Sequence, residues 1–177
     1  MPKLLLHICC GPCATAVIER LIDDYDITGY FYNPNIHPLE EYKRRLEAAR
    51  AAANRFGIPF IERRHNPEAF FKAVKGLEHE PENGVRCPVC YRMRLASTAE
   101  YAARNSFDCI ASTLTLGTQK KASVINPIGK DAAETTGVSF IEGDWKKKDG
   151  FKRSLELSHE MGMYRQHYCG CLFSMGK

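Results

Sequence analysis

Seven of the eight cysteines in this chain of 177 residues lie in three short motifs, and their thiols are the side chains here best suited to chemistry. The first motif is Cys9-Cys10-Gly11-Pro12-Cys13, the second runs from Cys87 to Cys90, and the third is Cys169-Gly170-Cys171. Cys109 stands apart in an apolar run, which is typical of a small buried hydrophobic residue. Thiolates this close together repel one another and oxidise readily, so the motifs indicate disulfides, zinc or an iron–sulfur cluster.

The composition argues against disulfides as structural staples. The chain is 44% hydrophobic and 26% charged, and it is long enough to bury a core without covalent cross-links. The apolar run 4–8 is too short for a membrane span and lacks the pattern of a signal peptide. We therefore expect a cytoplasmic protein with no membrane partner, whose reduced thiols hold metal or carry out redox chemistry. A net charge of +4 permits an acidic partner such as RNA without requiring one.

The spacing of the motifs favours an iron–sulfur cluster and leaves zinc open. A zinc ribbon usually has two CxxC pairs joined by a short connector, whereas the pairs Cys10–Cys13 and Cys87–Cys90 are far apart in this chain. Adjacent Cys9 and Cys10 can reach different irons of one cluster more easily than a single tetrahedral zinc. Seven thiols also exceed the needs of one cluster, so some are free to support a second metal or to move electrons. A disulfide within the third motif would close a small, strained and therefore labile ring.

Short apolar runs alternate with amphipathic stretches along the chain, which predicts strands joined by helical crossovers. Strands are expected over 3–8, 25–33, 58–62, 107–116 and 138–142. Helices are expected after the first motif, from Pro38 to Gly57, around 67–75, over 91–104, within 120–136 and over 155–161. The predicted fold class is α/β, three-layered and Rossmann-like, with a mostly parallel sheet. We expect residues 1–177 to form a single catalytic domain whose tail, 144–177, completes the site.

In such sheets the ligand site lies at the carboxyl ends of the strands. The first cysteine motif follows the first strand directly, so we place the metal site at this edge and expect folding to bring the other two motifs there. Asp144 follows the last strand at the same edge, where its carboxylate could bind metal or transfer a proton. His7, inside the first strand, is more typical of a hydrogen-bonded strand histidine than of a group that tunes a metal.

Basic residues near the motifs raise the possibility of contact with nucleic acid phosphates. A charge run is more often a solvated face, and the sequence leaves both interpretations open. The candidate phosphate contacts are Lys43 and Arg44 on the long helix, Arg86 beside the second motif, and Lys146, Lys147, Lys152 and Arg153 in the tail.

With these residues in view, the chain resembles the cobalamin-independent epoxyqueuosine reductases of the QueH family. The resemblance runs essentially from end to end and rests on four segments. They are HICCGPCA at 7–14, YNPNIHPLEEYKRR at 32–45, RCPVCYRMRL at 86–95 and GFKRSLELSHEMGMYRQHYCGCLFS at 150–174. This family is similar to the nucleotide-hydrolase-like folds, but the first motif stands where ATP-using relatives place a Ser/Gly-rich phosphate loop.

The resemblance implies reductive removal of the epoxide oxygen from epoxyqueuosine at the wobble position of a tRNA, the last step of queuosine biosynthesis. That reaction needs two electrons, two protons and an electron donor, which the sequence does not identify. The implied cofactors are a [4Fe–4S] cluster and an adjacent iron, without cobalamin. We assign Cys9, Cys10, Cys87 and Cys90 to the cluster, and we assign Cys13, Cys169 and Cys171 to the adjacent iron or to a dithiol pair. Asp144 would complete that iron's shell or relay a proton.

Two functions from other classes remain alternatives. A nucleotide-activating tRNA thiolation enzyme of similar fold would turn over ATP. A zinc-stabilised RNA-binding module would be colourless and contain zinc without sulfide.

Overall fold

The computed structural model describes residues 1–175 and has a five-stranded, fully parallel sheet in the order β3-β2-β1-β4-β5. The strands are β1 (Lys3–His7), β2 (Asp26–Phe31), β3 (Phe60–Glu62), β4 (Cys109–Ser112) and β5 (Ser139–Phe140). The α/β prediction is confirmed. The fourth strand is shorter than expected because Thr113 adopts helical backbone angles, and a 3-10 turn, η1 (Leu114–Leu116), follows it.

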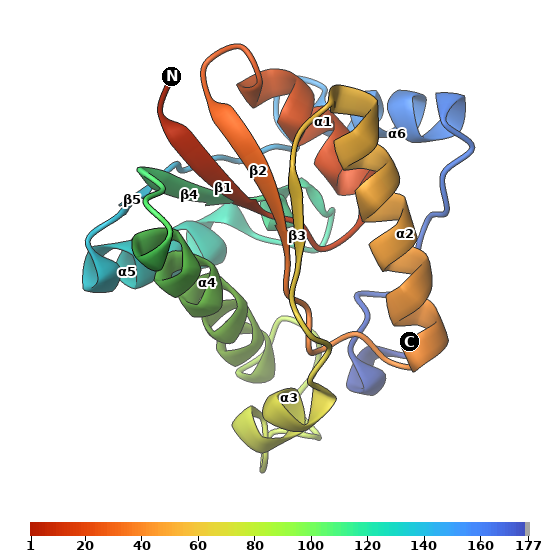
Figure 1. Cartoon of the computed structure of the whole chain (residues 1–177). Coiled ribbons are helices and arrows are strands. Elements are labelled where there is room, and N and C mark those ends of the chain that lie inside the picture. The colour runs from red at the N-terminus through yellow and green to blue at the C-terminus, as the bar shows by residue number, and fades with distance from the viewer. Residues whose placement is uncertain (176–177) are drawn as a thin grey trace.

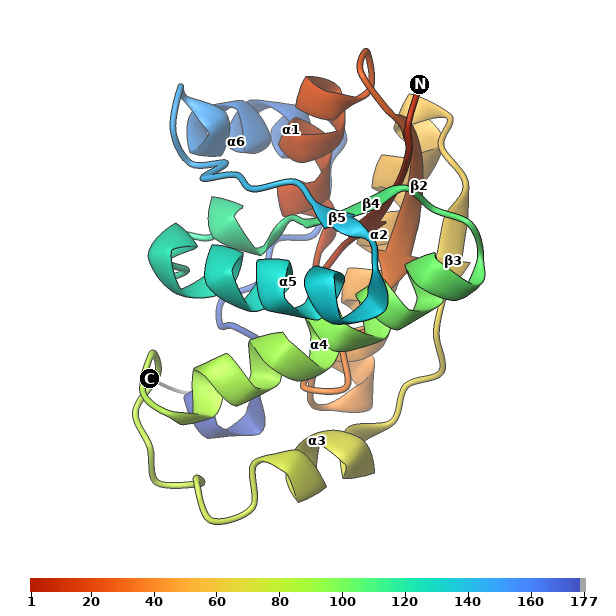
Figure 2. The same cartoon turned by 90° about the vertical axis from the view of Figure 1, so that its left-hand side faces the viewer.

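Helices cover both faces of the sheet (Figures 1 and 2). α1 and α2 lie on one face, with α6 packed on α1, and α4 and α5 pack together on the other face. The helices are α1 (Gly11–Leu21), α2 (Leu39–Phe56), α3 (Pro67–Ala73), α4 (Arg86–Arg104), α5 (Ala122–Thr136) and α6 (Gly150–Glu160), with a second 3-10 turn η2 (Leu172–Ser174). None of the helices within residues 1–175 combines the length and apolar composition that crossing a bilayer requires.

The alternation of side chains along β1 divides the core into two layers. Leu4, Leu6 and Ile8 belong to the cluster that β1 shares with α1 and α2, whereas Leu5 belongs to the cluster beneath α4 and α5. All four side chains are fully buried. A central parallel strand covered on both faces needs such a continuous apolar run, and this is why the sequence shows one.

The chain changes direction across the sheet at β1. From β1 it moves outward through β2 to β3 and then returns to β4 on the other side of β1. Segments that follow β1 and β4 therefore lead to opposite faces and leave a crevice between them. The first cysteine motif follows β1 at this point, as predicted.

Two helix boundaries matter for the site. α2 begins after Pro38 and ends at Gly57, whose φ of 65° is the left-handed cap that glycine favours, so both predicted ends are confirmed. α4 begins earlier than predicted, at Arg86 rather than Tyr91. Cys87 and Cys90 consequently lie on its first turns and share one side of the helix.

Candidate active site

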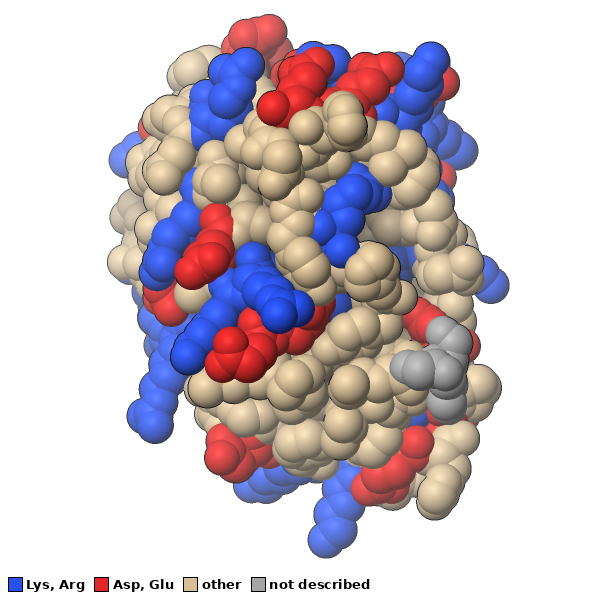
Figure 3. Space-filling view, turned by 90° about the vertical axis from the view of Figure 1, so that its right-hand side faces the viewer, with Lys and Arg blue, Asp and Glu red and all other residues tan. Residues whose placement is uncertain are grey.

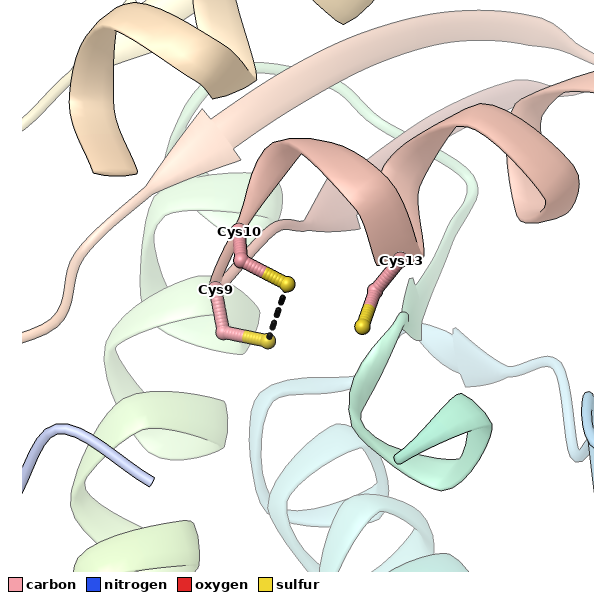
Figure 4. Close-up of side chains that lie close together, drawn as sticks. All are labelled: Cys9, Cys10 and Cys13. Atoms are coloured by element: carbon pink, nitrogen blue, oxygen red, sulfur yellow. Dashed lines mark hydrogen bonds between the residues drawn. The ribbon is translucent and has the colours of Figure 1, made fainter. Parts of the chain in front are cut away.

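Cys9, Cys10 and Cys13 form one group, the cysteine trio, whose sulfur atoms all lie within 4.8 Å of one another. Cys10 precedes α1 in extended conformation, and the Sγ atoms of Cys9 and Cys10 are 4.0 Å apart (Figure 4). Cys13, one turn into the helix, faces the same space. Gly11 lets this turn approach α2, because a Cβ there would lie 2.6 Å from the backbone of Ala48.

The trio stabilises one thiolate at a time. The pKa of Cys9 is held well below its usual range because its hydrogen bonds with Cys10 and Cys13 favour the thiolate form. The pKa of Cys13 is raised in turn, since its interactions with Cys10 and Cys9 favour the protonated form. A buried set of this kind is suited to binding a cation that displaces the remaining protons.

His7 supports the trio from β1 as a fully buried, hydrogen-bonded residue. Its Nδ1 lies 3.0 Å from Ser112 Oγ, and its Nε2 lies 3.2 Å from Asn33 Oδ1. Burial, together with the nearby charge of Arg94, lowers the pKa of His7 to about 4, so the ring is neutral near pH 7. His7 is therefore a hydrogen-bonded strand histidine, as the sequence predicts.

The other four motif cysteines line a second space, the cysteine cavity. Cys87 and Cys90 come from α4, and Cys169 and Cys171 come from the segment that precedes η2. The remaining lining residues are Asn35, Phe70, Glu82, Arg86, Tyr91, Arg94, Lys120 and Ser174. The structure thus groups the second motif with the third, whereas the sequence-based assignment paired it with Cys9 and Cys10.

Contacts from α2 and from the residues just before it hold the backbone of the third motif in place. Arg45 donates to the carbonyl oxygens of Tyr168 at 2.7 Å and Cys169 at 3.0 Å, and its Nε donates to Glu41 at 2.8 Å. The backbone of His37 donates to the carbonyl of Gly170 at 2.8 Å. Gly170 has a φ of 109°, which disfavours any side chain at this position.

The cavity wall carries more positive than negative charge: Arg86, Arg94 and Lys120 line it, and Glu82 is its one acidic lining residue among residues 1–175. The hydrogen bonds of Arg94 go to neutral oxygens, the carbonyl of Cys90 and the amide of Asn33. Burial by itself lowers the pKa of Arg94, but the thiolate charges of Cys90 and Cys9 outweigh it and raise that pKa. Arg94 therefore faces both groups of cysteines and favours anions in each.

Asp144 does not line the cysteine cavity. Its carboxylate lies 3.4 Å from Lys146 Nζ and 3.8 Å from Lys147 Nζ, along an open groove beside the start of α5. Lys146 Nζ also donates to the carbonyls of Thr115 and Lys120, so this lysine fastens the loop after η1. The structure therefore separates Asp144 from the thiols with which the sequence grouped it.

Arg86 is only 1% exposed and differs from the expected surface contact. Its Nη1 donates to the carbonyls of Leu77, Glu78 and Glu80, which holds the preceding loop against the start of α4. The guanidinium also lies 5.0 Å from the ring centroid of Phe173. A side chain so enclosed acts on the interior of the cavity rather than on a phosphate backbone.

The remaining predicted phosphate contacts lie at the surface. Lys43, Arg44, Lys147 and Lys152 are exposed, and Arg153 pairs with Glu19 at 2.7 Å. Figure 3 shows Lys and Arg interleaved with Asp and Glu over the face that it presents, rather than one continuous basic band.

Sequence reasoning missed three cavity or support residues. Arg94 lies four residues after Cys90 on α4, a spacing that places both on one helix face and could have signalled it. Arg45 directly follows the exposed Lys43 and Arg44, yet it is 2% exposed and paired with Glu41 one turn earlier. No local sequence pattern indicates a role for Lys120, because only the folded chain turns its side chain toward the cavity.

The model of the family described as epoxyqueuosine reductase QueH matches residues 4–177. The chain belongs to the QueH family. Relatives named epoxyqueuosine reductase QueH include those of Staphylococcus epidermidis (40% identical over 99% of this chain and 77% of the relative) and Haemophilus influenzae (42%, 98% and 71%). Membership of the QueH family makes this chain an oxidoreductase, as predicted, and places it among the enzymes of queuosine biosynthesis.

Solved structures with the fold of this QueH chain include two proteins of tRNA modification. A predicted subunit of a tRNA methyltransferase from Methanocaldococcus jannaschii aligns with a TM-score of 0.56 at 14% identity, covering 89% of this chain and 76% of that one. The U34-tRNA thiolase NcsA from Methanococcus maripaludis, solved with its [4Fe-4S] cluster, aligns with a TM-score of 0.55 at 13% identity. That match covers 93% of this chain and 58% of NcsA. At these sequence identities, the two matches show similarity of fold alone.

Proposed function

We propose that this chain reduces epoxyqueuosine in tRNA to queuosine, removing the epoxide oxygen as water with two electrons and two protons. The observation that carries the proposal is the cysteine cavity, in which thiols from two distant segments meet beneath buried cations. Family membership supplies the reaction, and the cavity supplies a place where redox chemistry can occur away from bulk water. We further propose that the protein works in the cytoplasm, where tRNA and reduced thiols are both found.

The donor set fits an iron–sulfur cluster. Burying guanidinium groups is costly unless negative charge compensates them, and Arg86 and Arg94 are 1% and 3% exposed beside the thiols. Cluster-bound thiolates would supply that charge. When bound, such a cluster delivers electrons one at a time, and an adjacent iron supplies a Lewis-acid site for oxygen. We propose this pair of cofactors, without cobalamin.

The ligand assignment stays a proposal with two competing forms. In the first, Cys9, Cys10, Cys87 and Cys90 hold the cluster, and Cys13, Cys169 and Cys171 serve an adjacent iron or form a dithiol. In the second, the cavity thiols (Cys87, Cys90, Cys169 and Cys171) hold the cluster and the trio binds the adjacent iron. The common lining of the cavity supports the second form.

Single Cys→Ala variants with iron and acid-labile sulfide counts separate the two forms. Both forms predict that Cys87→Ala loses the cluster. Only the second predicts cluster loss in Cys171→Ala with a cluster retained in Cys10→Ala. Cys109→Ala is the matched control, since Cys109 is equally buried but lies in β4, and it should keep full iron and sulfide.

The tRNA should bind through exposed cations by an electrostatic, salt-dependent interaction. We propose Lys43, Arg44, Lys147, Lys152 and Arg153 as its contacts, with Lys146 positioning the neighbouring loop and Asp144 holding Lys146 and Lys147. The modified base would leave its stack to reach the cavity. Lys43→Glu combined with Lys147→Glu should weaken tRNA binding and flatten its salt dependence, whereas unchanged affinity and slope would refute this footprint.

The proposed reaction is tested by incubating anaerobically reconstituted protein with epoxyqueuosine-containing tRNA and a strong one-electron reductant, followed by nucleoside mass analysis. We expect queuosine to appear with loss of one oxygen. A preparation that holds zinc without sulfide, or one that turns over ATP and leaves the epoxide intact, would overturn the proposal.

A further inference from the structure

Lys120 lies in a short turn between η1 and α5 and points inward, unlike the exposed Lys121 beside it. The fold creates space for its stem at Gly117. A Cβ on residue 117 would lie 2.9 Å from Lys120 Cγ, and the backbone of Lys120 donates to the carbonyl of Gly117 at 3.0 Å. The result is a lysine side chain only 14% exposed on the wall of the cysteine cavity.

The end of the Lys120 side chain has few partners for a buried ammonium group. Its Nζ is 4.0 Å from a carboxylate oxygen of Glu82 and 5.4 Å from the ring centroid of Tyr91. Burial by itself lowers the pKa of Lys120, but that pKa lies above the ordinary value for lysine, so the amine stays protonated near pH 7. An ammonium group has three N–H donors, and this one has donors left for a ligand.

Tyr91 adds an independent sign that a polar ligand belongs here. Its side chain is 3% exposed and lines the same cavity. Within residues 1–175 its hydroxyl oxygen has no hydrogen-bond partner. A buried hydroxyl without a partner is destabilising, and a ligand oxygen that accepts its hydrogen bond would remove this cost.

Lys120 also lines the open groove that contains Thr118, Asn126 and Asp144. It therefore lies at the boundary between the groove and the cysteine cavity. A substrate that entered along the groove would present its leading end to the Lys120 ammonium and to the thiols at the same time.

We propose that Lys120 donates a proton to the epoxide oxygen as its bonds to carbon break, and that the Tyr91 hydroxyl donates a hydrogen bond to the same oxygen. This inference rests on the proposed function. An alkoxide is far more basic than an amine, whose ordinary pKa is about 10.4, so the transfer is downhill. Asp144, the carboxylate considered from the sequence, lies outside the cavity and cannot fill this role directly.

The step balances as follows. One C–O bond breaks as the oxygen takes the Lys120 proton and becomes a hydroxyl group. The second C–O bond breaks as this group takes another proton and leaves as water, and the two ring carbons form a π bond. Two electrons come from a low-potential one-electron donor, and the cysteine thiols would hold the metal group that passes them on. Solvent in the groove returns protons to Lys120.

The test compares Lys120→Met with Lys130→Met, an exposed lysine on α5, in reconstituted protein under single-turnover conditions. We expect Lys120→Met to be about 100-fold slower or more, the range for loss of a general acid, and Lys130→Met to match the unsubstituted protein. Iron, sulfide and the Kd for tRNA should change by less than about twofold in both. Tyr91→Phe should show a smaller loss of rate.

A second measurement distinguishes proton donation from a structural role. In Lys120→Ala, added methylammonium or ethylammonium should restore part of the rate, because a small acid can occupy the space that the side chain leaves. Loss of iron in Lys120→Met, no rescue by amines, or a rate within about threefold of the unsubstituted protein would each overturn the inference. If the unsubstituted protein makes no queuosine, the proposed function fails first and the inference with it.

Discussion

Arg45 and Cys169 are joined by a hydrogen bond of 3.0 Å from the guanidinium to the backbone carbonyl, which fastens the third cysteine motif to the middle of α2. The contact does not involve the thiol. α2 therefore fixes the position of the Cys169 backbone, while the sulfur lies 2.8 Å from Ser174 Oγ on the cavity wall. Glu41 orients Arg45 from one turn earlier on the same helix.

Replacing Arg45 should therefore damage both stability and metal content. In Arg45→Met, two carbonyls lose their donors and Glu41 loses its buried partner, which should cost about 3–5 kcal/mol of unfolding free energy. Arg55→Met, on the exposed last turn of α2, is the control and should cost less than about 1 kcal/mol. Denaturant unfolding with parallel iron counts measures both effects. Equal losses in the two variants would contradict the role given to Arg45.

Gly170→Ala tests the backbone shape of the third motif. At a φ of 109° a side chain is strained, and its Cβ would lie 2.9 Å from Arg45 Nη1. We expect a loss of about 1–3 kcal/mol together with reduced iron content. Gly57→Ala is the comparison, because φ is 65° there but no atom lies within 4 Å of the added Cβ. That variant should keep its iron, and a thermal scan with metal analysis would show whether it does.

Glu41 should make stability depend on acid pH. Burial alone would raise the pKa of Glu41, but hydrogen bonds from Tyr164 and Arg45 outweigh it and lower that pKa below the ordinary 4.5. The stabilisation is therefore fully present above pH 4.5 and is lost as the pH falls through the lower, folded-state pKa.

Glu41→Gln should consequently be less stable than the unsubstituted protein at neutral pH, and the difference should shrink once the pH falls below 4.5. Urea unfolding of both proteins at several pH values measures it. Acid removes metal from both proteins alike, so the difference in their unfolding free energies measures the contribution of the Glu41 carboxylate. A difference that stays constant with pH would contradict the assignment.

The strands, the ends of α2 and the position of the first motif could be predicted because each depends on local pattern. A continuous apolar run such as Leu4, Leu5 and Leu6 is typical of a strand in a parallel sheet that is covered on both faces. The partners of each thiol could not be predicted in this way. Whether Cys87 faces Cys10 or Cys171 depends on how α4 and the tail pack, and no local spacing encodes that choice.

The burial of charged side chains is equally hard to predict from local sequence. Arg45 and Arg86 resemble their exposed neighbours Arg44 and Arg92 in sequence, yet both are buried because backbone carbonyls from other segments meet them. Lys120 and Lys121 are adjacent and face different surroundings. The sign of a charge is visible in the sequence, but its burial is decided by contacts from distant parts of the chain.

The cysteine cavity draws one pair of thiols from α4 and the other from a segment made much later in translation. A nascent chain that has emerged only through α5 would offer two of these four thiols, and Arg86, Arg94 and Lys120 would still lack their anionic partners. In the proposed assignment that places metal in this cavity, the set of four thiol ligands is complete only after synthesis has passed Cys171. The topology would then set an order for maturation, in which the tail is fastened to α2 before a cofactor can be bound by all four thiols.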